Sequence, residues 1–209
     1  YQRIAELAEA RLRDPVRALD AVGGWLAEDA SSEEALAELG RLAAATHRWA
    51  EIPARLRGIL DAATDDHVKK PLWCYLGEIQ LDRLGDAAGA EQSFREVLAL
   101  DDESLPALAA LERIYRQRGS VADLALVLLR RGELAFDPAQ KRAAFAEVAT
   151  LRELERELDG AIAAWRAVLE LDDGDREAID RVALIYERQG KSRELVDTLS
   201  QAARFARGG

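Results

Sequence analysis

The residues that could perform nucleophilic or metal chemistry are few and lie apart in the sequence. The chain has one cysteine, Cys74, and two histidines, His47 and His67. A nucleophilic thiol needs a neighbouring base, and a metal site needs ligands at close spacing. The histidines are expected in segments between helices, and Cys74 is expected to be half-buried on a helix. We therefore predict no catalytic residue and interpret both histidines as solvated.

An acidic run at residues 172–175, Asp-Asp-Gly-Asp, is similar to part of a calcium-binding loop. It lacks the alternating ligands and the distal glutamate that such a loop requires. Acidic turns recur at 28–31 and 101–104, each before a predicted helix, where carboxylates cap the helix and complement its dipole. Because Gly23–Gly24 falls within a predicted helix, it is not a phosphate-binding loop. The sequence thus predicts no metal site and no cofactor.

Composition and charge exclude several classes of partner. The 209 residues are 49% hydrophobic and carry a net charge of −10. The charge is spread evenly, with −3, −3 and −4 over residues 1–72, 73–144 and 145–209. Such a chain is unsuited to a phosphate backbone or an anionic membrane surface, and it has no apolar run long enough to span a bilayer. We expect neither a nucleic-acid partner nor membrane insertion, and we predict that the chain is not an enzyme.

The elements that must position any site are repeats, because apolar and small residues recur every 71 or 72 positions. Each aromatic residue of the first set is followed three places later by an apolar residue and then by a small one. The first set is Tyr1, Trp73 and Phe145, followed by Ile4-Ala5, Leu76-Gly77 and Val148-Ala149. Three further sets recur with the same period: Ala18, Ala90 and Ala161; Leu36, Leu108 and Ile179; Ile52, Leu124 and Leu195. Apolar spacings of three and four predict four helices, or two helical hairpins, in each repeat.

Turn and cap residues fall at the ends of these predicted helices. Asp14 and Asp137 each precede a proline, which is typical of an N-cap followed by the first helical residue, and Asp175 is expected to cap a helix too. Gly119 and Gly190 occupy matching turns, where a positive φ can end one helix and begin the reversal. The equivalent residue of the first repeat is His47. We expect that turn to be strained or shaped differently.

The motif Trp73-x-x-Leu76-Gly77, followed by Ala90-x-x-x-Phe94, resembles the signature of the tetratricopeptide (TPR) repeat family. Gln80 replaces the tyrosine of that signature, Asp102 replaces its closing proline, and the alternate hairpins are more divergent. The resemblance covers essentially the whole chain. It implies an all-α fold, a right-handed α-solenoid of about six TPR-like hairpins arranged as three double repeats of about 72 residues.

The domain organisation expected from these repeats is a single domain over residues 1–209, with sub-repeats at about 1–72, 73–144 and 145–209. The chain opens at Tyr1 inside a predicted helix and contains no methionine, so we expect it to be a piece of a larger protein. Arginine outnumbers lysine 25 to 4, a composition that favours a bacterial source.

In TPR arrays the first helix of each hairpin lines a concave groove in which partners bind. By resemblance, eight residues of this sequence are predicted to face that groove: Glu6, Arg41, Glu78, Arg113, Arg116, Thr150, Glu153 and Asp180. Arg41, Arg113 and Arg116 are the predicted anchoring residues, since arginine is enriched at interface hot spots.

Two functional hypotheses follow from the predicted fold. The first is a protein–protein interaction scaffold that binds a peptide or helix of another protein in its groove. The alternative is an architectural spacer or oligomerisation segment of a longer array with no ligand in the groove. We also expect the exposed terminal hairpins to allow self-association, because the ends of an array lack a covering neighbour.

Overall fold

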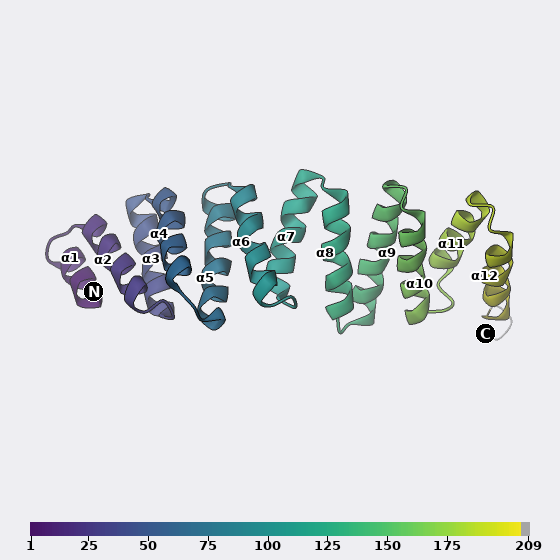
Figure 1. Cartoon of the computed structure of the whole chain (residues 1–209), viewed down its shortest axis with the longest axis horizontal. Helices are drawn as coiled ribbons and strands as arrows, with labels where there is room; N and C mark the ends of the chain where they lie inside the picture. Colours follow the sequence, from purple (N-terminus) through teal and green to yellow (C-terminus); the bar gives the residue numbers. More distant parts are fainter. Residues whose placement is uncertain (206–209) are drawn as a thin grey trace. The chain divides into compact units, whose positions relative to one another are not determined.

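The structure is a computed structural model that describes residues 1–205, apart from the side chains of Ala202, Arg204 and Phe205. The described residues form twelve α-helices and no strand (Figure 1). They divide into two compact units, Tyr1–Ala107 and Leu108–Gly209. Residues 206–209 of the third predicted sub-repeat lie outside the described residues. The predicted fold class, an all-α helical repeat, is confirmed.

The first unit contains three hairpins whose helices pack in chain order. Helix α1 packs on α2, α2 contacts α3 and α4, α4 lies against α5, and α5 packs on α6. A 3₁₀ turn at Trp49–Glu51 precedes α4, and a π-helical stretch at Ile79–Arg83 follows α5. The helices are α1 (Gln2–Ala10), α2 (Pro15–Glu28), α3 (Glu33–Thr46), α4 (Ile52–Ala62), α5 (Asp66–Glu78) and α6 (Ala87–Leu100).

The second unit contains the other three hairpins, although α7 begins just before it. Helix α9 packs on both α8 and α10, α10 contacts α11, and α11 packs on α12. The helices are α7 (Leu105–Arg118), α8 (Val121–Leu134), α9 (Pro138–Leu154), α10 (Leu158–Leu171), α11 (Arg176–Arg188) and α12 (Ser192–Phe205). Across the described part of the chain, no helix combines the length and the apolarity needed to cross a membrane.

Every hairpin turns at one residue with a left-handed backbone, and these residues repeat with the sequence period. Their φ angles lie between 53° and 73°: Arg13, Gly85 and Arg156 in one class of hairpin, and His47, Gly119 and Gly190 in the other. The predicted positive φ at Gly119 and Gly190 is confirmed. His47 adopts the same conformation as these glycines, with φ of 55°. The first repeat therefore keeps the turn shape and accepts the strain of a side chain in this region.

Helix starts also follow the predicted chemistry. Asp14, Asp137 and Asp175 are N-caps, each accepting a backbone N–H two or three residues later at 3.0, 3.1 and 2.9 Å. Pro15 and Pro138 occupy the first helical position after two of these caps. These contacts satisfy donors that the helix itself leaves unpaired.

Small residues let the helices of each hairpin approach closely. Ala18, Ala90 and Ala161 are all fully buried at the matching position of α2, α6 and α10. A Cβ at Gly77 of α5 would lie 2.8 Å from the Phe94 ring, so glycine makes room for that ring. The core thus follows the pattern of small and large residues in the sequence.

Gln80, the residue that replaces the TPR tyrosine, lies in the π-helical stretch after α5. Its side chain is buried, and in the orientation that satisfies both ends of the amide, its nitrogen donates to the Ser93 hydroxyl of α6 at 2.6 Å. The hairpin therefore closes on a pair of buried polar side chains that satisfy each other.

Candidate functional site

A hollow of about 360 Å³ lies between α3 and the end of α5 in the first unit. Small residues form its α3 wall, whereas aromatic and charged residues and one isoleucine form the rest. The α3 wall is Ala37, Gly40 and Ala44, and the other lining residues are Trp49, Tyr75, Glu78, Ile79, Asp82 and Arg83. The hollow thus combines apolar surface with a few charged groups, as ligand sites commonly do.

Two aromatic rings shape this hollow. A Cβ at Gly40 would lie only 2.5 Å from the Tyr75 hydroxyl oxygen, so the glycine lets the phenol reach α3. Trp49 is half-buried in the 3₁₀ turn, and the Arg83 guanidinium lies 5.2 Å from its ring centroid. This distance is within cation–π range. One wall of the hollow therefore already holds a cation against an aromatic face.

The charge in the hollow is mainly negative. Glu78 and Asp82 are acidic, and only Arg83 is basic. Burial raises the pKa of the Tyr75 hydroxyl, and the negative charge of Glu78 raises it further. The same two causes raise the pKa of the Cys74 thiol, in that order. Both groups therefore stay neutral at pH 7. The negative charge of the hollow comes from Glu78 and Asp82.

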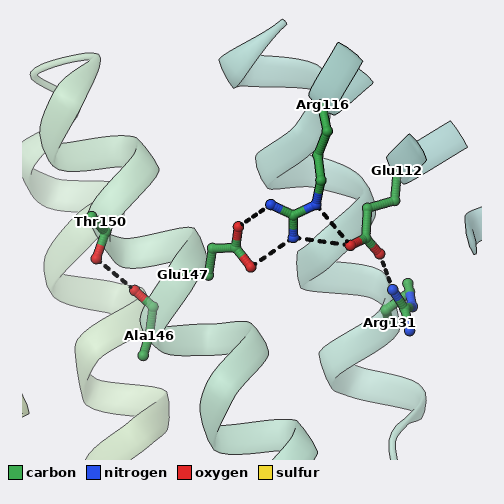
Figure 2. A network of polar contacts seen from close by, with 6 residues as sticks. All are labelled: Glu112, Arg116, Arg131, Ala146, Glu147 and Thr150. Atoms are coloured by element: carbon green, nitrogen blue, oxygen red, sulfur yellow. Dashed lines mark hydrogen bonds and ion pairs between the residues drawn. The ribbon is translucent and has the colours of Figure 1, made fainter. Parts of the chain in front are cut away.

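The second unit places an ion-pair network at the equivalent positions. Arg116 of α7 binds the Glu147 carboxylate of α9 through two hydrogen bonds, at 2.5 and 2.8 Å (Figure 2). Its Nε also donates to Glu112, one turn earlier, at 3.0 Å. Glu112 in turn pairs with Arg131 of α8. Bidentate and shared contacts of this kind hold side chains in one geometry.

The two arrangements occupy the same repeat positions. Residues 72 positions apart show the exchange: Gly40 corresponds to Glu112, Ala44 to Arg116, and Tyr75 to Glu147. In the first unit, two small residues and one aromatic residue line a hollow. In the second unit, the Arg116 guanidinium pairs with both the Glu112 and the Glu147 carboxylates. The α3–α5 position is consequently the candidate site. At the α7–α9 position the aligned residues form ion pairs with one another instead of lining a hollow.

Of the predicted groove residues, Arg41 and Arg116 are bound to carboxylates on neighbouring helices. Arg41 of α3 donates to both oxygens of Glu9 on α1, at 2.9 and 2.5 Å, and to Glu38 on its own helix. The hydrogen bonds that Arg41 donates to Glu38 and Glu9 raise the pKa of its guanidinium. Pairs of first helices from successive hairpins therefore lie side by side, at α1–α3 and at α7–α9.

The remaining predicted groove residues lie in different surroundings. Glu78 lines the hollow, Glu6 is exposed and pairs with Arg3 at 2.8 Å, and Arg113 and Asp180 are exposed. Thr150 donates to the backbone of its own helix at 2.9 Å (Figure 2). Glu153 accepts hydrogen bonds from Trp165 at 2.8 Å and from Arg181 at 3.3 Å. Only Glu78 among the eight belongs to the hollow, and their common role in a groove stays a prediction.

The candidate chemical residues form no further centre. His47 and His67 are exposed, but His67 lies in the first turn of α5, so its predicted place between helices is wrong. Asp65 caps that helix directly ahead of it, which extends the helix to His67. Cys74 is free and half-buried as predicted. Among the described residues no cluster of histidine, cysteine and acidic side chains could hold a metal ion.

A second hollow, of about 420 Å³, lies between α2 and α4. Its walls are mostly glycine and alanine, and Arg55 crosses it to pair with Asp20 at 2.5 Å. It contains no aromatic side chain. The α3–α5 hollow therefore has the more specific chemistry, although it is smaller.

Gly40, Trp49 and Tyr75 are not among the residues predicted from the sequence. The predicted groove residues are mostly charged, whereas this hollow is lined largely by small and aromatic residues. A signal was present in the repeat alignment, because Gly40 and Tyr75 align with Glu112 and Glu147. Positions that change from charged to small or aromatic between repeats would have indicated the hollow.

Comparison with known proteins finds similarity at the level of fold. No family model and no curated protein matches the chain. A TPR protein from Parabacteroides merdae is similar at 14% identity and a TM-score of 0.46, over 98% of this chain and 80% of that one. The C-terminal part of a TPR protein from Cytophaga hutchinsonii is similar at 13% identity and a TM-score of 0.44, over 96% and 80%. A crystal structure of MamA is similar at 19% identity and a TM-score of 0.41, over 78% and 91%.

Proposed function

We propose that the chain is a protein-interaction module whose first unit binds a segment of a partner protein at the α3–α5 hollow. The observation that carries this proposal is the hollow itself, lined by Trp49, Tyr75 and Glu78 where the second unit holds a closed ion-pair network. Because small residues stand where the second unit has large charged ones, the surface of the hollow is open to another molecule.

The chemistry of the lining favours a lysine or arginine side chain of the partner. Glu78 and Asp82 supply negative charge, and the rings of Tyr75 and Trp49 supply faces on which an alkyl stem or a cation can lie. Arg83 already shows that a guanidinium fits against Trp49. An acidic partner would instead meet two carboxylates, which like-charge repulsion disfavours.

The proposal shifts the main anchor away from the arginines singled out in the sequence. Arg41 and Arg116 are bound to Glu9 and Glu147, so a ligand would have to replace those contacts. Glu78 needs no such exchange to meet a basic group. We therefore place the hollow of the first unit at the centre of the interface, with Glu78 as its acidic anchor.

The test is selection of peptides from a random display library on the whole chain. Affinities of the selected peptides are then measured by calorimetry against the chain and its Glu78→Gln variant. We expect a shared basic residue whose replacement by alanine weakens binding at least about tenfold, with a similar loss in Glu78→Gln. Glu6→Gln is the matched control, because Glu6 occupies the equivalent position of α1 and lines no such hollow. Peptides without a basic residue, or equal binding to Glu78→Gln, would contradict the proposal.

A second candidate is an architectural segment without a groove ligand. The ion pairs that join successive hairpins favour it, namely Glu9–Arg41, Arg116–Glu147 and Arg142–Asp175. If stiffening the array is the only role, no library peptide binds in the hollow. Charge removal at Arg41 then lowers stability and changes no binding property.

A further inference from the structure

Arg83 lines the α3–α5 hollow, and an aromatic ring rather than a carboxylate holds it. Its guanidinium lies 5.2 Å from the Trp49 ring centroid. Among the described residues no carboxylate forms an ion pair with it, whereas Arg41 and Arg116 are each bound by two. Arg83 is exposed, and cation–π contacts at exposed sites are weak. Another cation can therefore replace Arg83 on the ring.

An extra residue near the end of α5 helps to set where Arg83 points. The turn residues Gly85 and Arg156 are 71 positions apart, whereas the helices that precede them align at 72. The π-helical stretch that ends at Arg83 absorbs this residue, and the Leu84 N–H donates to the Ile79 carbonyl, five residues earlier, at 3.1 Å. At the end of α9 the equivalent bond spans four residues. Because one residue corresponds to about 100° of rotation in a helix, the extra residue changes the direction of the side chains that follow it.

A basic side chain of a partner would meet Arg83 on the surface that it needs. Trp49 supplies the hollow with a ring face, and Arg83 lies over that ring. Two cations beside one ring repel each other, so the ring is suited to one of them at a time. Glu78 and Asp82 line the same hollow and attract whichever cation is present.

We propose that Arg83 is a built-in competitor, which occupies the Trp49 ring in the free chain and is replaced there by the basic side chain of the partner. This exchange rests on the proposed function of the hollow and adds a control on its affinity. The Kd of every basic ligand is raised by the competition, because only the fraction of molecules with a free ring can bind. A lone basic side chain should therefore bind weakly, and a partner must add contacts elsewhere to bind well.

The test uses N-acetylargininamide as the probe, because it carries a guanidinium and no other charge. Its Kd for the whole chain is measured by NMR from the shift of the Trp49 indole N–H, which a Trp49→Phe variant assigns. Arg83→Gln should lower this Kd at least about threefold, since it removes both the competing contact and the like charge. Arg83 is exposed, so folding is expected to survive, as checked by circular dichroism.

Arg11→Gln is the matched control for the change in net charge. Arg11 occupies the equivalent position after α1 and does not line the hollow, so the Kd should stay close to that of the unmodified chain. The Glu78→Gln variant is measured in parallel and should bind the probe more weakly, as the proposed function requires.

Three outcomes would overturn the competition. If Arg83→Gln binds no more tightly than Arg11→Gln while Glu78→Gln loses affinity, Arg83 is no competitor and the proposed function stands. Weaker binding by Arg83→Gln would place Arg83 among the residues that hold the ligand. If Glu78→Gln binds as the unmodified chain does, or if no chain binds the probe, the proposed function itself fails and the competition fails with it.

Discussion

The α3–α5 position of the first unit and the α7–α9 position of the second are built on the same helices of the repeat, and three aligned positions exchange small or aromatic side chains for charged ones. Gly40, Ala44 and Tyr75 leave a hollow of about 360 Å³. Their counterparts, which include Arg116 and Glu147, are joined by ion pairs. Two repeats can therefore share a backbone and differ in whether the side chains at one position form ion pairs with one another or leave a hollow.

The two positions separate residues that pack the helices from residues that are free to vary between repeats. Helix packing requires the buried small and large residues, which the two units share, as at Ala18, Ala90 and Ala161. Most of the residues that line the α3–α5 hollow are released from that requirement, and their aligned residues differ between repeats. Under the proposed function, the binding residues are those at which equivalent positions of the repeat differ.

The largest effect is expected from exchanging the three side chains. The triple variant Gly40→Glu, Ala44→Arg, Tyr75→Glu places the charged residue types of the second unit's network at the aligned positions of the first unit. Because the new side chains fill the hollow and bind one another, peptide affinity should fall at least about thirtyfold, roughly 2 kcal/mol, as measured by calorimetry.

The reciprocal exchange is the control for that variant. Glu112→Gly, Arg116→Ala and Glu147→Tyr remove the network from the second unit and should leave peptide affinity at the first unit unchanged. Retained binding in the first triple variant would show that the hollow is not the site, provided that its helical circular dichroism equals that of the unmodified chain.

A smaller effect is expected from breaking the network at its centre. Glu112 binds both Arg116 and Arg131, and its side chain is only 15% exposed. Glu112→Ala leaves two guanidinium groups without this partner, so the free energy of unfolding should fall by about 1–2 kcal/mol in urea titration. Gly40→Ala at the matching position is the comparison, and it should displace the Tyr75 hydroxyl and weaken peptide binding instead. Equal stability of Glu112→Ala and the unmodified chain would show that the network is only a surface feature.

A third prediction concerns pH, because the N-caps of the two units differ. Ser32 caps α3 and Asp175, the aligned residue, caps α11. Burial would raise the pKa of Asp175, but hydrogen bonds from Arg142 and from the Ala178 N–H hold it below its usual value. Its contribution to stability is therefore complete above the unfolded pKa of about 3.9 and is lost as pH falls through the lower folded pKa.

Asp175→Asn measures this contribution. It should cost about 1 kcal/mol at pH 7 and flatten the acid limb of the stability curve in denaturant titrations between about pH 5 and pH 2. Ser32 does not titrate, so Ser32→Ala should lower stability without changing the slope. A slope that is unchanged in Asp175→Asn would assign the acid sensitivity to other carboxylates.

The sequence was sufficient to predict the fold, whereas the site required the structure. Periods of 71 and 72 residues identified the helices, because buried positions tolerate few residue types, as at Leu76 and Val148. Glu78 was predicted on the groove face and does line the hollow. The pairing of Arg41 with Glu9 could not be predicted, since a charged residue on an exposed face has many rotamers and several partners within reach.

The smallest effect is expected at the turns that follow α3 and α7, the first helices of the α3–α5 and α7–α9 positions. His47 and Gly119 both have positive φ, at 55° and 73°. A non-glycine residue in this conformation destabilises the folded chain by about 1–2 kcal/mol. Replacing it with glycine recovers only part of that free energy, because glycine loses more backbone entropy on folding. His47→Gly should therefore stabilise the chain by about 0.5–1 kcal/mol, and Gly119→His should destabilise it by a similar amount.

Thermal unfolding of the two variants and of their combination decides this prediction. The combined variant merely moves the strained turn from the first unit to the second, so its stability should return close to that of the unmodified chain. His47 is exposed, so the exchange removes no buried side chain. Destabilisation by His47→Gly would therefore show that the backbone entropy of glycine outweighs the strain at this turn, and that the two units do not share one turn energy.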